Sequence, residues 1–213
     1  MMFDPKTHWD NIYKTKSPHT VSWYTPHLAK SLDLIRALGL SADAHILDVG
    51  AGASTLPEDL FAEGFKHITV LDISSEALKV SAGRLGNTAR QVHWIEADVT
   101  RASLQPDQYD LWHDRAVFHF LTTREERRAY IDQCGTSLKR GGYVLMATFG
   151  PNGPLQCSGL GIVRYSPESL EQEFGKAFRL ETHCIETHHT PFETTQEFLY
   201  CLFQKLPQDR TCR

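Results

Sequence analysis

The sequence predicts an α/β fold with one mostly parallel sheet and helices on both of its faces. Apolar segments of strand length alternate along the chain with segments in which apolar residues recur at helical spacing, and this alternation is typical of parallel sheets. The last two apolar segments, 178–187 and 197–205, are interpreted as an antiparallel pair of strands. A glycine turn at 50–52 separates the first strand from the next helix, which is the geometry that holds a nucleotide-like ligand.

The first half of the chain begins with a polar and aromatic segment, 8–24, and continues as strand–helix units. Leucine and isoleucine recur at helical spacing over 26–39, so a helix is expected there. Gly64 is expected to end the helix after the first strand, and Ser74 or Ser75 to begin the next helix. The expected elements are helices at 26–39, at 56–63 and from 74 or 75 onwards, with strands at 45–49, 67–71 and 92–95.

The second half supplies four more strands, which brings the expected sheet to seven. The segment 143–149 is an almost unbroken apolar run, as a central strand of a parallel sheet should be. Gly141-Gly142 closes the helix that precedes it, and Ser166 is expected to cap a later helix. The expected elements are strands at 109–113, 143–149, 178–187 and 197–205, helices at 124–139 and 166–174, and a long loop at 151–160.

The composition is that of one ordinary globular domain, expected to cover 1–213. Apolar residues make up 41% of the chain and charged residues 23%, and the length suits a single α/β sheet. The net charge of −4 argues against a general basic surface, so no nucleic-acid partner is expected. The oligomeric state is left open, and a monomer is compatible with these observations.

The cysteines and histidines predict neither a disulfide framework nor a metal site. Five cysteines are an odd number and form no C-x-x-C pair, and the eleven histidines lack H-E-x-x-H spacing, so a reducing compartment and no metal are expected. The first residues lack the apolar core of a signal peptide, and no apolar run suits a membrane span. A cytoplasmic location without a membrane partner is the expectation.

The residues around the glycine turn indicate what kind of ligand it holds. Gly50 and Gly52 let the backbone approach a ligand where a Cβ would collide. Thr55 stands where a dinucleotide-binding turn has its third small residue, and no Gly-Lys-Ser/Thr follows, so neither a dinucleotide nor a P-loop site is favoured. Asp48, two residues before the turn, would repel a pyrophosphate and attract a cationic or amine-bearing ligand.

Two further acids follow the second and third strands. Asp72 ends an apolar run, and an acid at this place can accept hydrogen bonds from both hydroxyls of a ribose. Asp98 follows the strand at 92–95 in the same way. The alternative is that both acids only cap the helices that follow, because Asp is a favoured N-cap residue.

The D-x-G-x-G pattern from Asp48 to Gly52 resembles the first motif of class I S-adenosylmethionine-dependent methyltransferases. The resemblance implies a Rossmann-like seven-stranded sheet and a cofactor that carries an amino group and a sulfonium. It also implies that Asp98 accepts a hydrogen bond from the adenine amino group and that the next backbone N–H meets a ring nitrogen. The expected cofactor-binding residues are Trp9, Tyr13, Trp23, Asp48, Gly50, Ala51, Gly52, Ser54, Asp72, Ile73, Asp98, Val99 and His113.

Two other motifs resemble different methyltransferase groups. The segment from Trp112 to Val117 is similar to the W-D-R-[GA]-A segment of the thiopurine methyltransferase-like group, with an extra residue, His113, before Asp114. The start Trp9-Asp10-x-x-Tyr13 resembles small lysine methyltransferases with a W-[DE]-x-x-Y motif. The first resemblance implies a small-molecule acceptor, and the second implies a protein lysine.

The N-terminal aromatic residues are interpreted as a lid. Residues 1–25 are expected to form this lid and 26–205 the core of the domain. Trp9, Tyr13 and Trp23 could cover the methionine end of the cofactor and attract its sulfonium through their ring faces. The alternative is that these rings only pack on the edge of the sheet.

The fourth strand is expected to end at the acceptor. His113 is the residue best placed to accept the acceptor's proton or to orient it. Asp114 and Arg115 could support His113 or bind an acidic group of the substrate, and His119 could face the site from the following segment. The predicted function is methyl transfer to a small molecule, such as a thiol, by in-line displacement. The alternatives are a protein lysine methyltransferase and a non-catalytic cofactor-binding module.

Overall fold

The computed structural model describes residues 3–207, and its centre is a seven-stranded sheet. Neighbouring strands pair in parallel from β3 to β5, whereas β9 runs antiparallel to both of its neighbours. This arrangement is the mostly parallel sheet with a C-terminal antiparallel pair that the sequence predicts. The strand order is β3 (Val92–Glu96), β2 (His67–Asp72), β1 (His45–Val49), β4 (Tyr109–Arg115), β5 (Leu138–Phe149), β9 (Thr195–Lys205) and β8 (Phe178–His189).

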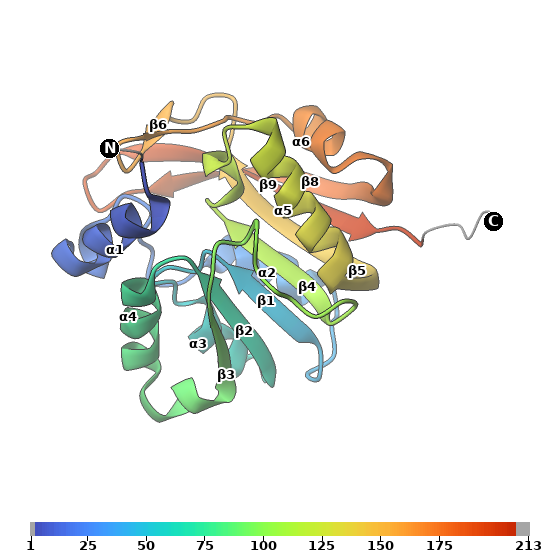
Figure 1. Ribbon diagram of the computed structural model, residues 1–213, viewed down its shortest axis with the longest axis horizontal. Helices are drawn as coiled ribbons and strands as arrows, with labels where there is room; N and C mark the ends of the chain where they lie inside the picture. Colours follow the sequence, from blue (N-terminus) through green and yellow to red (C-terminus); the bar gives the residue numbers. More distant parts are fainter. Residues whose placement is uncertain (1–2, 208–213) are drawn as a thin grey trace.

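Helices cover both faces of this sheet (Figure 1). In the view of Figure 1, α5 and α6 lie in front of the strands, and α2 and α3 lie behind them. Short 3-10 turns and a small hairpin of β6 and β7 complete the fold. The helices are α1 (Pro5–Thr15), α2 (Ala29–Ala37), α3 (Leu56–Ala62), α4 (Ser75–Leu85), α5 (Arg124–Ser137) and α6 (Pro167–Phe174); the 3-10 turns are η1 (Pro18–Thr20), η2 (Gly86–Gln91), η3 (Phe118–Phe120) and η4 (Gly175–Ala177); the hairpin joins β6 (Gln156–Cys157) to β7 (Leu160–Gly161).

The alternation of side chains along the strands produces two separate cores, one on each face. Ile46 and Leu111 face the layer of α2, α3 and α4, and they are fully buried against it. Leu47 and Trp112, one residue further along the same strands, face α5 and α6. Because both faces are covered, these strands are apolar on both sides, as parallel strands usually are.

The structure differs from the sequence-based expectations mainly at the N-terminus and around β5. Residues 5–15 form the helix α1, where the sequence predicts only a polar and aromatic segment. The Asp4 side chain caps the start of this helix by accepting a hydrogen bond from the Thr7 amide at 3.0 Å. Helix α5 ends at Ser137 rather than 139, because Leu138 already pairs with Tyr109 of β4. The loop expected at 151–160 contains the β6–β7 hairpin at its end.

The topology brings the ligand-binding edge to the junction of β1 and β4. On one side of this junction, β1 is followed outwards by β2 and then β3. On the other side, β4 is followed outwards by β5. In open α/β sheets, ligands bind beyond the carboxyl ends of the strands where the order reverses in this way. The glycine turn follows β1 at this point, and η3 follows β4.

Among residues 3–207, no helix combines the length and the apolar character that are needed to cross a bilayer.

Candidate functional site

The glycine turn after β1 adopts a backbone conformation that only glycine adopts easily. Gly50 and Gly52 have φ angles of +58° and +56°, in the left-handed region. The Gly50 amide donates to the carbonyl of Leu71 in β2 at 2.7 Å, which anchors the turn to the sheet. A Cβ on Gly52 would lie 2.1 Å from the Tyr13 hydroxyl oxygen, and one on Gly50 would lie 1.8 Å from Cγ2 of Val117. Both conformation and close packing therefore require glycine here.

We expect Gly52→Ala to weaken cofactor binding more than its backbone strain alone explains. The matched control is Gly39→Ala, because Gly39 has a φ of +60° and open space around its Cβ position. Gly39→Ala should lower the free energy of unfolding by about 1–2 kcal/mol, whereas Gly52→Ala should also displace Tyr13. Denaturation and calorimetry with S-adenosylhomocysteine measure the two effects. Equal behaviour of the two variants would show that the contact between Tyr13 and the turn is unimportant.

Asp48 lies under the turn, where one of its oxygens has a partner and the other does not. Its side chain is buried, and Oδ1 lies 2.7 Å from Nδ1 of His113. Oδ2 is buried and has no hydrogen-bond partner within residues 3–207. Buried carboxylate oxygens are rarely left unpaired in folded proteins. Oδ2 therefore fits a ligand that brings a hydrogen-bond donor, such as an ammonium group.

His113 connects Asp48 to helix α2. Its ring is fully buried, and its Nε2 lies 2.9 Å from the Ser31 hydroxyl on α2. With Nδ1 on Asp48 and Nε2 on Ser31, both ring nitrogens are engaged. Both contacts lie within the fold, and we propose that His113 is a positioning residue for the Asp48 carboxylate.

This arrangement predicts a ligand-selective effect of His113→Ala. Loss of one hydrogen bond to Asp48 should weaken S-adenosylhomocysteine binding by about 3- to 10-fold, which corresponds to about 0.5–1.5 kcal/mol. Binding of methylthioadenosine should not change, because that ligand lacks the amino-acid moiety. Calorimetry with both ligands tests this, with His93→Ala in the exposed part of β3 as the control. Intact binding of both ligands with abolished turnover would restore the proton-accepting role.

Asp72 at the end of β2 is held by two backbone amides. Oδ2 accepts from Gly52 N and Oδ1 from Ser74 N, both at 2.7 Å. Burial raises the pKa of this carboxyl to about 6, and the two amide hydrogen bonds oppose the increase. Each carboxylate oxygen has a second lone pair, so Asp72 can still accept hydrogen bonds from ribose hydroxyls. Its neighbour Ile73 accepts through its carbonyl from the Lys6 ammonium at 3.4 Å.

Asp98 caps a turn after β3, where the alternative interpretation of the sequence expects a helix. Its Oδ1 accepts from the Thr100 amide at 2.9 Å and from the Thr100 hydroxyl at 2.7 Å. Within the described part of the chain, both of these hydrogen bonds go to Oδ1, and the Asp98 side chain remains partly exposed. The next residue, Val99, is buried. Asp98 could therefore both cap the turn and accept from an adenine amino group.

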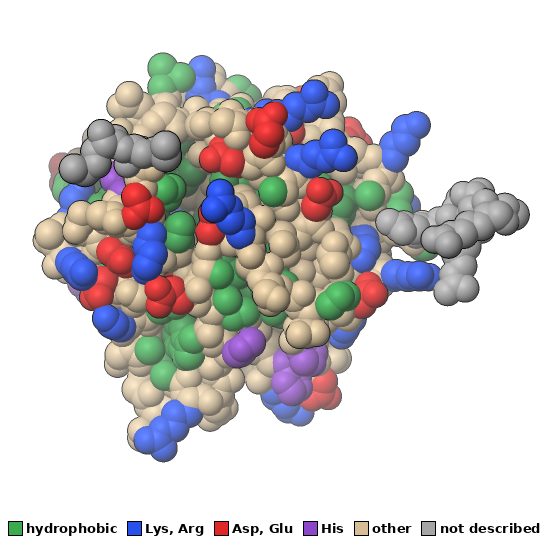
Figure 2. Space-filling model, viewed as in Figure 1, with side chains coloured by type: hydrophobic (Ala, Val, Ile, Leu, Met, Phe, Trp, Pro, Cys, Tyr) green, Lys and Arg blue, Asp and Glu red, His purple; other side chains and the backbone are tan. Residues whose placement is uncertain are grey.

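Helix α1 is tied to the cofactor side of the sheet by polar contacts. Oδ1 of Asp10 accepts from the Ser74 hydroxyl at 2.7 Å, at the start of α4. The Lys6 ammonium lies 2.7 Å from a carboxylate oxygen of Glu96 at the end of β3. Figure 2 shows acidic and basic side chains interspersed at the left, where α1 and α4 lie in Figure 1. The N-terminal segment is thus held over the same strand ends that carry Asp72 and Asp98.

The aromatic residues expected in the lid form one cluster with a residue from the segment after β4. The Trp9 ring lies edge-on to Trp23 and Phe120, with centroid distances of 5.9 and 5.2 Å, and 6.4 Å from Tyr13. Trp9 therefore connects the residue over the glycine turn, Tyr13, with the segment that follows β4. Ala51 and Ser54 belong to the turn beneath, where the Ser54 amide donates to the Ala51 carbonyl at 2.8 Å.

Asp114 makes only contacts that hold the fold together. Its oxygens accept from the Tyr130 hydroxyl at 2.5 Å, from Val117 N at 2.9 Å and from Phe118 N at 3.1 Å. Burial raises the pKa of Asp114 to about 6, and the Tyr130 hydroxyl is the largest opposing influence. Asp114 alternates with His113 and faces the other side of the sheet. It is therefore placed to shape the turn after β4 rather than to support His113.

Arg115 and His119 both lie beside the aromatic cluster. Nη1 of Arg115 donates to the Trp23 carbonyl at 3.1 Å, and the guanidinium carbon lies 4.3 Å from the centroid of Phe198. His119 is fully buried, and its Nδ1 accepts from the Phe149 amide at 3.3 Å. The structure brings these two residues to the same end of the sheet as Trp23.

Two side chains that hold His113 and Asp114 were not expected from the sequence, namely Ser31 and Tyr130. The sequence could have indicated Ser31, because this residue lies on the same apolar side of α2 as Leu28 and Leu32. A polar side chain buried there needs a hydrogen-bond partner. Tyr130 lies on the buried side of α5, and in the sequence it looks like any aromatic residue of a helix that faces the core. Its partner could not be inferred from periodicity.

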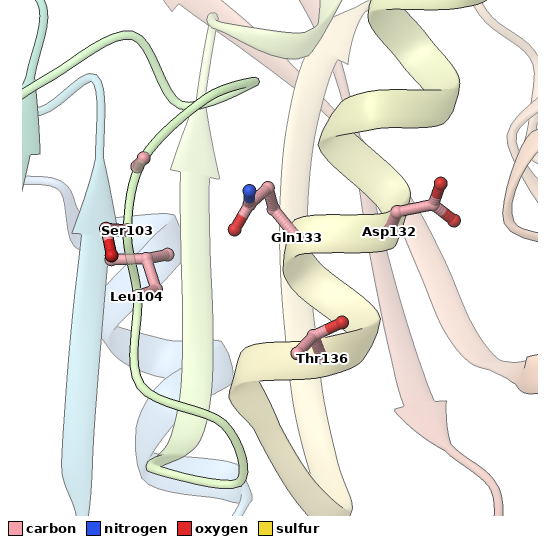
Figure 3. Close-up of a pocket in the computed structure, with 6 residues that line it drawn as sticks. Ser103, Leu104, Asp132, Gln133 and Thr136 are labelled. Carbon is pink, nitrogen blue, oxygen red and sulfur yellow. The ribbon is translucent and has the colours of Figure 1, made fainter.

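A shallow hollow on the α5 face belongs to a different part of the molecule. Gln133 points from α5 towards the loop that follows β3 (Figure 3). The hollow includes no residue of the glycine turn or of the aromatic cluster. It is lined by Ala102, Ser103, Leu104, Asp132, Gln133 and Thr136.

Comparisons with known proteins agree with this geometry. A family model described as "Methyltransferase domain" matches residues 47–144, just under half of the chain, from β1 into β5. The chain is 28% identical to a ubiquinone biosynthesis O-methyltransferase of Nitrosomonas europaea over 145 residues, 68% of this chain and 58% of that protein. It is 25% identical to the eEF1A lysine and N-terminal methyltransferase homolog of Drosophila melanogaster over 132 residues, 61% of this chain. The chain thus spans less than two thirds of these relatives, and only 19% of the fly protein.

Solved structures show the same fold over nearly the whole chain. A structure described as "Conversion of a Disulfide Bond into a Thioacetal Group during Echinomycin Biosynthesis" superposes with a TM-score of 0.78 at 17% identity, covering 98% of this chain and 95% of the other. The N-methyltransferase NodS from Bradyrhizobium japonicum, in complex with S-adenosylhomocysteine, superposes with a TM-score of 0.68 at 17% identity and covers 94% and 97%. The chain therefore has the fold of these solved structures, and its residues 47–144 match a methyltransferase domain.

Proposed function

We propose that this protein transfers a methyl group from S-adenosylmethionine to a small-molecule acceptor, with a thiol or another soft nucleophile as the preferred class. The observation that carries the choice of acceptor is the charge beside the aromatic cluster. The Arg115 guanidinium lies beside this cluster and has no carboxylate within ion-pair distance among residues 3–207. A guanidinium repels the ammonium group of a lysine, attracts an anionic acceptor such as a thiolate and does not repel a neutral one.

Three acids and the N-terminal aromatic residues would hold the cofactor. The free Oδ2 of Asp48 suits its amino group, Asp72 its ribose and Asp98 its adenine amino group. When bound, S-adenosylmethionine supplies a methyl group activated by a sulfonium. Trp9 and Tyr13 would present aromatic ring faces to that charge.

The chain's contribution to the reaction is mainly orientation and exclusion of water. Methyl transfer needs the nucleophile about 3 Å from the methyl group and in line with the departing sulfur. Helix α1 and Trp23 would close the site from solvent, which strengthens electrostatic interactions inside it. A thiol has a pKa near 8.5 and reaches its reactive anion without a dedicated base, whereas a lysine amine has a pKa near 10.4. The engaged state of His113 is therefore compatible with a thiol acceptor.

A protein lysine acceptor is the second candidate, favoured by the relatives named for eEF1A and by the Trp9-Asp10-x-x-Tyr13 motif. In this structure Asp10 is engaged with Ser74 and lies 3.3 Å from the Lys6 ammonium. The motif thus has a structural use in fixing α1. The resemblance of the Trp112–Val117 segment to the thiopurine methyltransferase-like group favours the small acceptor.

Incubation with methyl-labelled S-adenosylmethionine tests the proposal. The protein is offered panels of small thiols, phenols and carboxylic acids, and separately a cell lysate resolved by size. We expect the label in a small-molecule fraction, with transfer strongly reduced in Asp72→Ala and retained in Asp132→Ala, which alters an exposed residue of α5. Label that appears only in protein lysines would replace the proposal with its alternative.

A further inference from the structure

Arg115, at the end of β4, is a cation that lacks an anion. Its Nη1 donates to the Trp23 carbonyl, while its Nε–H is buried and has no acceptor among residues 3–207. The Phe198 ring beneath it supplies a cation–π contact but no hydrogen bond. A guanidinium stays charged at any physiological pH, and partial burial of that charge is costly unless an anion pairs with it. The free Nε–H edge is the part of an arginine that commonly grips a carboxylate.

His119 supplies a second donor without a partner. Because its Nδ1 accepts from the Phe149 amide, its proton must reside on Nε2. That Nε2–H is buried and has no acceptor among the described residues. Burial lowers the pKa of His119 to about 3, and Arg115 adds to the effect. The ring is therefore neutral at physiological pH and acts as a fixed hydrogen-bond donor.

The two donors share one aromatic wall. The His119 ring lies 4.7 Å from Phe149, which in turn lies 4.9 Å from Phe198, the ring beneath Arg115. Next to His119, Phe120 contacts Trp9 of the lid at a centroid distance of 5.2 Å. Two unpaired donors thus lie among buried rings, next to the partly exposed rings of Trp9 and Phe120 in the aromatic cluster. This combination suits a molecule with an apolar body and a single anionic group.

We propose that Arg115 and His119 form a carboxylate-binding subsite for the acceptor, which is accordingly a small apolar acid that carries its nucleophile at the other end. The inference rests on the proposed methyl transfer to a small molecule and names the substrate class. A carboxylate would take one hydrogen bond from Nε of Arg115 and one from Nε2 of His119. The acceptor's apolar body would lie against the partly exposed rings of Trp9 and Phe120.

Matched acceptor pairs that differ only in a carboxylate test this subsite. The probes are 3-mercaptobenzoate with benzenethiol, and 4-hydroxybenzoate with phenol, offered with methyl-labelled S-adenosylmethionine. We expect kcat/KM for the acid of at least one pair to exceed that of its neutral partner by at least about tenfold. Arg115→Gln should lower kcat/KM for the acid by at least about tenfold more than for its neutral partner, which removes the preference. Arg128→Gln, an exposed arginine on α5, should keep the preference.

The possible results separate this inference from the proposed function. Methylation of neutral acceptors at the same rate as acids, or an equal loss for both in Arg115→Gln, overturns the subsite and leaves small-molecule methylation standing. Label found only in protein overturns the proposed function. If no probe is methylated, calorimetry on the protein saturated with S-adenosylhomocysteine decides between the outcomes. Benzoate that binds more tightly than benzamide, with this difference lost in Arg115→Gln, supports the subsite. Equal binding of the two compounds overturns it.

Discussion

Replacement of Asp114 by alanine should lower the free energy of unfolding by about 3–5 kcal/mol, the size of effect seen when a buried charged partner is removed. The change would leave the Tyr130 hydroxyl and the amides of Val117 and Phe118 without their acceptor. Tyr130 itself accepts from Nε1 of Trp112 at 2.7 Å, so the loss would extend into the aromatic core next to α5. Each buried donor left unpaired costs about 1–3 kcal/mol.

Chemical denaturation measures this effect, and Asp132→Ala provides its control. Asp132 is exposed on α5 and lies 4.0 Å from Arg128, a surface ion pair that should contribute less than about 1 kcal/mol. A loss of under about 1 kcal/mol for Asp114→Ala, accompanied by a collapse of turnover, would contradict the structural role. It would return Asp114 to the catalytic group that the sequence suggests.

Asp72→Ala should weaken binding of S-adenosylhomocysteine by about 10- to 100-fold at pH 7.5, corresponding to about 1.5–3 kcal/mol for a charged hydrogen-bond set. The effect comes from the lost acceptor for the ribose hydroxyls, and also from the amides of Gly52 and Ser74 that Asp72 now holds. Equilibrium dialysis with labelled ligand measures it. Asp43→Ala, which alters an exposed acid paired with Lys66, should leave the affinity unchanged.

The same residue predicts a pH dependence with a definite sign. Burial raises the pKa of Asp72 to about 6, and the ionised form is the better acceptor for ribose hydroxyls. Affinity should therefore be full well above pH 6, about half of that at pH 6, and fall by up to about tenfold per pH unit below it. Because the folded-state pKa lies above the ordinary value, ionisation of Asp72 between about pH 4 and 6 lowers the stability of the ligand-free fold. A pH-independent affinity, or one that rises towards pH 5, would exclude Asp72 as the ribose acceptor.

Much of this fold could be predicted because its information is local. Strands such as 45–49 and 67–71 are short apolar runs bounded by turn residues, and their observed limits differ by one residue at most. The strand-end position of Asp48 and Asp72 follows from the same pattern. Parallel strands then bring their carboxyl ends together without further information.

The contacts between distant segments could not be predicted in the same way. The pairing of His113 with Asp48 depends on the register of β4 against β1, in which Asp48 lies opposite His113, and 65 residues separate the two in sequence. A histidine at a strand end next to a ligand-binding turn equally suggests a base. Helix α1 was missed because its apolar residues are mostly aromatic, and their partners, Trp23 and Phe120, lie outside the helix.

Calorimetric titration of S-adenosylhomocysteine into the purified protein is the most direct test of the site at the end of β1 and β2. The geometry predicts one ligand per chain and a loss of affinity of at least about tenfold in Asp48→Ala and Asp72→Ala, with wild-type binding in Asp132→Ala. Absence of binding to the wild-type protein, or equal affinity in all four proteins, would contradict the assignment of these carboxylates to the cofactor.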